Sequence, residues 1–405
     1  MRKPRAWRPK FALAAMFAAL AAATVFGART LARADALEAP TPASLGERIF
    51  ADTSLSASGR MACATCHDPA HAHAQSNDLS VQYGGPGLDI AGARAVPSLQ
   101  YLSLIPRFGF GDDGPFGGFD RDGRADTLMV QAMRPLLSAN EMANASVEEL
   151  IQRLAVTPYA GEFRQVYGAD IFGDPNAAFQ ALLFSLQQYQ LLDPDFRPFD
   201  SKYDYFLRGQ AQLAAAELRG LALFNNPEKG NCAACHPSHR GASGEPPMFT
   251  DFTYDNLGVP RNDEIPANAD PAYYDLGLCG PDRTDLADQR DLCGAFKVPT
   301  LRNVATRHVF FHNGRFHTLH DALQFYVQRD TNPERFYPVA SDGSVLKFDD
   351  LPPEDRRNVN TEEVPYDRHP GEAPRLTDAE LDDLEAFLNT LTDGYDPAAP
   401  GAGAP

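Results

Sequence analysis

The sequence predicts a mainly α-helical protein in which two tandem halves share one organisation and carry long loops. Apolar residues recur at helical spacing in several segments, whereas the alternating pattern of β-strands is scarce. The 31 glycines and 33 prolines gather in long stretches between those segments. Each half also runs through a helix, a Cys-x-x-Cys-His motif, a long loop and further helices, which indicates duplication of a whole domain.

Helix signals occur along the whole chain. A capping box of Ser44 and Glu47 predicts the start of a short helix, and Ser146 with Glu149 predicts another over residues 146–154. A polar joint at residues 193–204 predicts a boundary between domains at 40–200 and 205–395. The other expected helices cover residues 125–133, 177–190, 210–224, 318–327 and 377–391, the long loops cover 68–122 and 237–296, and residues 396–405 have the composition of a disordered tail.

The N-terminus has the pattern of an export signal. Basic residues precede an uncharged stretch over residues 11–28, and small residues at Ala32 and Ala34 form a cleavage site. An uncleaved membrane anchor is the alternative, because the uncharged stretch is at the lower limit for spanning a bilayer. We expect residues 1–34 to be a removed signal peptide, so the mature protein is periplasmic, not bound to a membrane, and lacks Trp7.

Composition excludes several classes of protein. With 405 residues, 43% of them hydrophobic, the chain is long and apolar enough for two domains, so intrinsic disorder and a small disulfide scaffold are excluded. The formal net charge of −18 argues against a nucleic-acid partner, because affinity for DNA depends on neutralising phosphates.

Two motifs of the form Cys-x-x-Cys-His predict covalent haem c. In each, two cysteines can form thioethers with one porphyrin edge while the histidine ligates iron. A zinc site is the alternative, but the two cysteine pairs lie far apart in sequence. A redox dithiol is another alternative, but it does not require the histidine. The predicted haem ligands are Cys63, Cys66 and His67 in the first motif and Cys232, Cys235 and His236 in the second.

The remaining cysteines, Cys279 and Cys293, are expected to form a disulfide, because thiols oxidise outside the cytoplasm. Closing a loop of about 15 residues would contribute about 3 kcal/mol to stability in the chain-entropy model.

Two haems alone would also suit an electron carrier. The deciding feature is the sixth position on each iron, since a blocked iron transfers electrons and an open one can bind peroxide.

Further motifs identify the family. Over residues 40–395 the chain resembles the bacterial di-haem cytochrome c peroxidase/MauG superfamily. This resemblance implies two tandem cytochrome c-type domains, each with one covalent haem c, and places the peroxide-reacting haem in the N-terminal domain. Besides the haem motifs, it rests on Asp122-Gly123-Arg124-Ala125, on Lys297-Val298-Pro299-Thr300-Leu301-Arg302-Asn303-Val304, and on Phe311-His312-Asn313-Gly314 followed by Leu319 and Ala322.

The resemblance also implies catalytic residues at the first haem. Counted from Asp122, the family's distal Gln and Glu fall on Gln131 and Glu141; read alone, Glu141 would be a surface carboxylate. The distal histidine of ordinary di-haem peroxidases is replaced by Gly87, so we expect an open or water-bound iron. The nearby His71 and His73 are expected to be solvated loop residues.

Three further positions depart from the ordinary peroxidases. Tyr326 stands where they place a methionine ligand of the second haem, as in MauG-like members, although it could be an ordinary core tyrosine. The tryptophan between the haems is replaced by Asp89 or a neighbour, so coupling needs another aromatic residue or direct proximity. Ala95 replaces an asparagine that helps bind calcium, so a calcium ion remains possible but is not favoured.

The expected function is a di-haem oxidoreductase that reacts with hydrogen peroxide at the N-terminal haem, assisted by Glu141 and Gln131. The C-terminal haem would pass the oxidising equivalents to a partner, with MauG-like oxidation of a protein side chain as one outcome. The alternatives are an ordinary peroxidase that detoxifies peroxide with electrons from a cytochrome c or cupredoxin, and a non-enzymatic electron carrier.

Overall fold

The computed structural model describes residues 39–399 and is mostly helical with little sheet, as the sequence predicts. The predicted signal over residues 1–34 and the tail residues 400–405 lie outside the described part. The helices are α2 (Pro42–Ala51), α3 (Cys63–Cys66), α4 (Leu128–Leu137), α5 (Val147–Leu154), α6 (Ala160–Tyr167), α7 (Pro175–Leu192), α8 (Lys202–Leu207), α9 (Ala215–Asn225), α10 (Leu319–Gln328) and α11 (Asp378–Asn389).

The strands form three short antiparallel pairs. They are β1 (Tyr83–Gly84) with β2 (Ile90–Ala91), β3 (Gly109–Gly111) with β4 (Gly114–Phe116), and β5 (Tyr254–Asp255) with β6 (Phe296–Lys297). Within the described residues, no helix is long and apolar enough to cross a bilayer.

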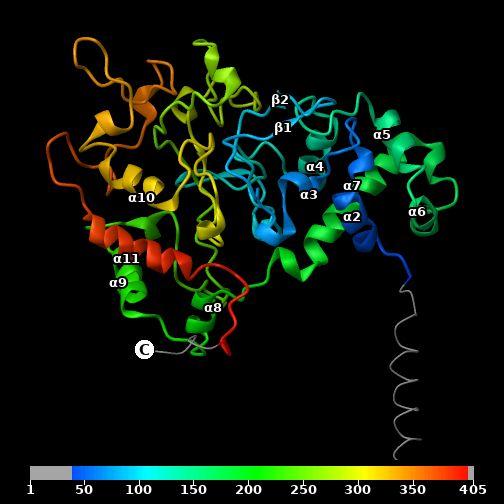
Figure 1. Cartoon of the computed structure of the whole chain (residues 1–405), viewed down its shortest axis with the longest axis horizontal. Coiled ribbons are helices and arrows are strands. Elements are labelled where there is room, and N and C mark those ends of the chain that lie inside the picture. The colour runs from blue at the N-terminus through cyan, green and yellow to red at the C-terminus, as the bar shows by residue number, and fades with distance from the viewer. Residues whose placement is uncertain (1–38, 400–405) are drawn as a thin grey trace, which may run out of the picture. The chain divides into compact units, whose positions relative to one another are not determined.

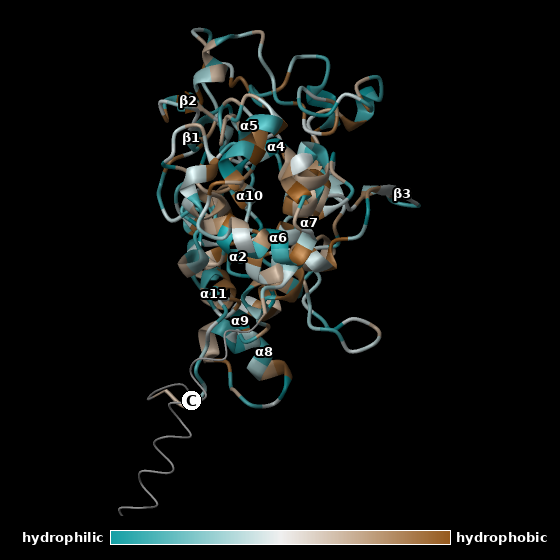
Figure 2. Cartoon of the chain, turned by 90° about the vertical axis from the view of Figure 1, so that its right-hand side faces the viewer, coloured by the Kyte–Doolittle hydropathy of each residue, from teal (hydrophilic) through white to brown (hydrophobic). Residues whose placement is uncertain are grey.

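Each half of the chain has its own hydrophobic core. The first core joins α2, α4, α5 and α7, and the second joins α8 to α11. Helices α2 and α7 lie side by side, as do α9 and α11 (Figure 1). Figure 2 shows apolar and polar positions alternating around these helices, as expected for helices that bury one side. From Pro42 onward the described residues belong to one compact unit.

The two halves repeat one close helix contact. A Cβ atom added to Gly46 of α2 would lie 2.0 Å from the Ser185 carbonyl oxygen of α7. A Cβ atom added to Gly220 of α9 would lie 2.0 Å from the Asp383 carbonyl oxygen of α11. In both halves a glycine therefore lets the helix before the haem motif touch the backbone of the last helix.

Several helix boundaries differ from the prediction. Helix α2 begins at Pro42, so Ser44 lies inside it rather than capping it. The Ser146 hydroxyl does cap α5, accepting a hydrogen bond from the Glu149 amide. The segment 193–204 includes the start of α8, which Ser201 caps together with Asp204. The division into domains at this segment stays a prediction.

The Lys297–Val304 motif holds the second half together. The guanidinium of Arg302, which is 1% exposed, donates two hydrogen bonds of 2.9 Å to Asp204. The amide of Asn303 donates to Gln100 at 2.6 Å, which joins the motif to the first half.

Replacing Arg302 by alanine is expected to destabilise the protein by about 3–5 kcal/mol, because Asp204 would remain buried without its partner. Chemical unfolding followed by circular dichroism measures the change. The control is Arg48→Ala, which breaks an exposed pair with Glu162 and should cost about 0–1 kcal/mol. Equal effects of the two substitutions would contradict this role for Arg302.

Candidate haem sites

The first candidate site is a cavity of about 200 Å³ in the N-terminal half. It brings together all the residues predicted for the peroxide-reacting haem. Lining residues include Cys63, Cys66, His67, Gln131 and Glu141.

His67 is held by the backbone on one side of this cavity. It follows α3, and its amide donates to the Cys63 carbonyl at 2.9 Å. Its Nδ1 lies 3.3 Å from the His73 carbonyl oxygen, which leaves Nε2 as the ligating atom. Burial lowers the pKa of His67 to about 4, so the ring is neutral at pH 7, as a metal ligand requires.

His73 contradicts the expectation of a solvated loop residue. Its side chain is 1% exposed, and the ring stacks on Phe196 with 3.9 Å between centroids. An edge contact with Phe50 completes its surroundings. The aromatic residues that cover His73 come from distant segments, which explains why its polar loop did not indicate burial.

Gln131 reaches the cavity from α4, and Glu141 reaches it from the turn that follows α4. The Gln131 amide is 3.4 Å from an Asp120 carboxylate oxygen. Strand β1 packs directly on the turn, because a Cβ atom at Gly84 would lie 2.3 Å from the Asn140 carbonyl oxygen. The Gly85 amide also donates to the Glu141 carbonyl at 2.9 Å. These contacts fix the Glu141 backbone, and sequence reasoning missed the positioning role of Gly84, which does not itself line the cavity.

The surroundings of Glu141 favour its protonated form. Burial raises the pKa of the Glu141 carboxyl, while nearby Arg134 and Arg124 oppose the shift. Asp282 from the second half forms ion pairs with both arginines, at 3.0 Å from Arg134 and 3.2 Å from Arg124. Glu141 is thus not the surface carboxylate that it would be if read alone.

Among the described residues that line the first cavity, His67 is the single histidine. Gly87, at the position of the missing distal histidine, does not line the cavity; its carbonyl accepts a hydrogen bond from Arg60 at 3.3 Å.

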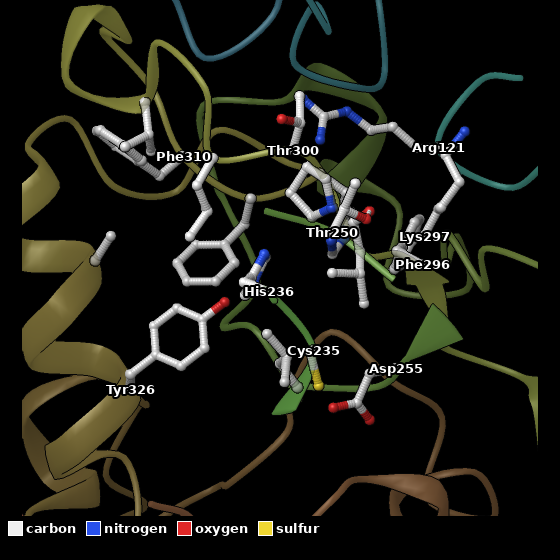
Figure 3. Close-up of a pocket in the computed structure, with 18 of the residues that line it drawn as sticks. Arg121, Cys235, His236, Thr250, Asp255, Phe296, Lys297, Thr300, Phe310 and Tyr326 are labelled. Carbon is white, nitrogen blue, oxygen red and sulfur yellow. Dashed lines mark hydrogen bonds between the residues drawn. The ribbon is translucent and has the colours of Figure 1, made fainter. Parts of the chain in front are cut away.

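The second candidate site is a cavity of about 330 Å³, lined by Cys232, Cys235, His236 and Tyr326. The His236 Nδ1 donates to the Phe249 carbonyl at 2.8 Å, which again leaves Nε2 as the ligating atom. Tyr326 projects from α10, and Figure 3 shows its hydroxyl directed toward His236. Burial raises the pKa of Tyr326, so a phenolate here requires a cation such as iron.

The four motif cysteines line the two cavities, and none of them is in a disulfide. Burial raises the pKa of Cys63 to about 12 and that of Cys66 to about 11, which argues against a reactive dithiol. In the described part of the chain, one cluster of three metal-ligating side chains occurs, and it combines Cys235 with Asp255 and Glu363. Because Cys232 and His236 are outside this cluster, the motif does not form a zinc site, and a covalent haem fits the residues better.

Cys279 and Cys293 form the predicted disulfide. It closes part of the long 237–296 loop, which contains Asp282 of the first cavity.

The position expected for the missing tryptophan, Asp89, is exposed and outside both cavities. Six residues line the first and the second cavity at once, and none of these shared residues is aromatic. They are Val96, Pro97, Leu99, Asp120, Arg121 and Gln131.

The model of the di-haem cytochrome c peroxidase family matches residues 40–212. The methylamine utilization protein MauG of Paracoccus denitrificans is 35% identical over 371 residues, covering 88% of this chain and 89% of that protein. The chain belongs to the di-haem cytochrome c peroxidase/MauG family.

Other members of this family are also similar. The crystal structure of the di-haem peroxidase BthA from Burkholderia thailandensis is 42% identical, with a TM-score of 0.80 over 88% of this chain and 86% of that one. Cytochrome c551 peroxidase of Nitrosomonas europaea is 26% identical and covers 72% of this chain and 74% of its own length. Membership in a di-haem family implies two haem c groups as cofactors.

Proposed function

We propose that this chain is a periplasmic di-haem enzyme that reacts with hydrogen peroxide in the first cavity and delivers oxidising equivalents to a protein through the second. The observation that carries the proposal is that Glu141 and Gln131 share the first cavity with His67 and with no other histidine of the described chain. Such a cavity has a candidate acid–base group and leaves room for a small substrate.

The chain's own residues would hold both haems. Cys63 and Cys66 would attach the first and His67 would ligate it; the second haem would use the ligands Cys232, Cys235, His236 and Tyr326. When bound, haem supplies iron that accepts and passes on oxidising equivalents.

Glu141 would move the proton. Its carboxylate is placed to take a proton from one peroxide oxygen and return it to the other, which assists cleavage of the O–O bond. A raised pKa makes the Glu141 carboxylate a stronger base for the first of these proton transfers. The Gln131 amide would orient the peroxide, since it both donates and accepts hydrogen bonds.

The choice between MauG-like protein oxidation and peroxide detoxification rests on Tyr326. Phenolate favours the oxidised states of iron, so a haem with this ligand suits storing oxidising equivalents better than accepting electrons from a cytochrome c or cupredoxin. A tyrosine-to-methionine variant of BthA, itself a di-haem peroxidase, has been crystallised. The net charge of −18 favours a basic partner through electrostatic steering.

The first test is electron paramagnetic resonance of the ferric holoprotein. We expect one high-spin haem, because the first cavity lacks a second histidine ligand, and rapid spectral change on adding peroxide. Two low-spin signals with no response to peroxide would instead support the electron carrier. Turnover with reduced cytochrome c, compared with oxidation of a protein substrate, then separates the two enzymatic alternatives.

A further inference from the structure

Three cationic side chains gather on the wall between the two cavities. Arg121, Lys297 and Arg307 all line the larger cavity, and Arg121 also lines the smaller one. We call these three residues the cationic cluster. Figure 3 shows Arg121 and Lys297 together at the end of the larger cavity away from Tyr326.

The members of the cationic cluster lack acidic partners among residues 39–399. The Arg121 Nε donates to the Ala95 carbonyl at 3.0 Å, and the Lys297 ammonium donates to the Gly118 carbonyl. Burial lowers the pKa of Lys297 to about 8 and also lowers the pKa values of both arginines. A buried cation without an anion is costly, so the cluster has the properties of an anion site.

Most acids of the larger cavity have partners outside the cluster. Of the five carboxylates that line this cavity, Asp255 and Glu363 accept hydrogen bonds from Asn360, and the other three form ion pairs with arginines. The pairs are Asp120 with Arg124 at 3.3 Å, Asp275 with Arg94 at 2.6 Å, and Asp350 with Arg261 at 3.2 Å.

Backbone contacts hold the cluster between the halves. Arg121 comes from the first half, whereas Lys297 and Arg307 come from the second. The Lys297 amide donates to the Arg121 carbonyl at 2.8 Å, which keeps these two residues adjacent. An anion that binds this cluster must therefore lie beside Arg121, which lines both cavities.

We propose that the cationic cluster binds the propionate carboxylates of the two haems, and that Arg121 contacts those of both. This inference rests on the proposed function, which places a haem in each cavity. Each haem carries two propionate carboxylates, and guanidinium groups pair with carboxylates through two parallel hydrogen bonds. The bridging charge of Arg121 then links the electrostatics of the two irons.

The consequence is a specific pattern of reduction potentials. A nearby positive charge disfavours the oxidised iron, so removing it lowers the potential. Arg121→Gln is expected to lower the potentials of both haems, each by at least a tenfold change in the ferric-to-ferrous ratio, about 59 mV for one electron. Lys297→Gln should lower mainly the potential of the haem in the larger cavity, whereas Arg307→Gln should also lower that of the first haem, because the Arg307 charge acts on His67.

The test uses the full-length holoprotein. Intact mass first shows whether two haems are attached, and spectroelectrochemical titration then gives both potentials. Arg121→Lys retains the charge and should keep the wild-type potentials, as should Arg48→Gln at the exposed pair with Glu162. If Arg121→Gln fails to fold, Lys297→Gln and Arg307→Gln still test the inference.

Unchanged potentials in glutamine variants that carry both haems would overturn the inference. So would potentials of the wild type that respond to added chloride or phosphate while those of the variants do not, since the cluster would then hold a free anion. A wild-type protein without attached haem would instead overturn the proposed function.

Discussion

Replacing Glu141 by glutamine is expected to slow the reaction with peroxide by about 10²–10⁴-fold, the usual contribution of a positioned acid–base group. Glutamine preserves the shape of the side chain but cannot accept a proton. Stopped-flow absorbance of the ferric holoprotein mixed with peroxide measures the rate. Haem content should stay at two per chain, because Glu141 is not among the attachment residues.

The matched control is Glu148→Gln on α5, an exposed carboxylate in the same half. Its rate should equal that of the wild type. The pH profile provides a second readout, because the carboxylate form of Glu141 accepts the proton. The wild-type rate should fall as the pH drops through the raised pKa of Glu141, above the ordinary value for glutamate. A profile that is identical in Glu141→Gln would remove Glu141 from the mechanism.

Replacing Tyr326 by methionine is expected to raise the reduction potential of the second haem by a sizeable part of the roughly 0.8 V that axial ligands span. Methionine favours ferrous iron, whereas a phenolate favours ferric iron. Spectroelectrochemical titration of the two haems measures the change. The potential of the first haem should shift less, because Tyr326 lines the larger cavity and not the smaller one.

Two further variants sharpen this measurement. Tyr326→Phe removes the hydroxyl and retains the ring, so the second haem should become high-spin. Tyr205→Met alters a tyrosine of α8 that lines neither cavity, and both potentials should stay at the wild-type values. An unchanged second potential in Tyr326→Met would mean that Tyr326 is a core residue.

Local signals in the sequence predicted a good part of this molecule. The Cys-x-x-Cys-His motifs predicted which cysteines and histidines lie together, because their spacing alone brings the sulfur atoms and the imidazole close to each other. The helix around Leu381, Leu384 and Leu388 followed from its apolar stripe, and all three side chains are buried. The disulfide was predicted from the expected location outside the cytoplasm, where thiols oxidise, and from the one pair of cysteines left over after the haem motifs.

What the sequence did not indicate depends on contacts between distant segments. The burial of His73 requires Phe50 and Phe196. The short helix α8 is an exception, because its capping box of Ser201 and Asp204 is a local signal that could have revealed it. Gly84 could not be recognised, because the need for glycine arises from a turn more than fifty residues later.

The position of Asp282 limits how this protein can be divided. A fragment with residues 40–200 would retain Cys63, His67 and Glu141 but would lose the carboxylate that forms an ion pair with Arg134. That arginine would then be free to pair with Glu141 and keep it ionised. The two halves are thus not interchangeable modules, and a fragment cut from the first half would need a new acid beside Arg134 to preserve the surroundings of Glu141.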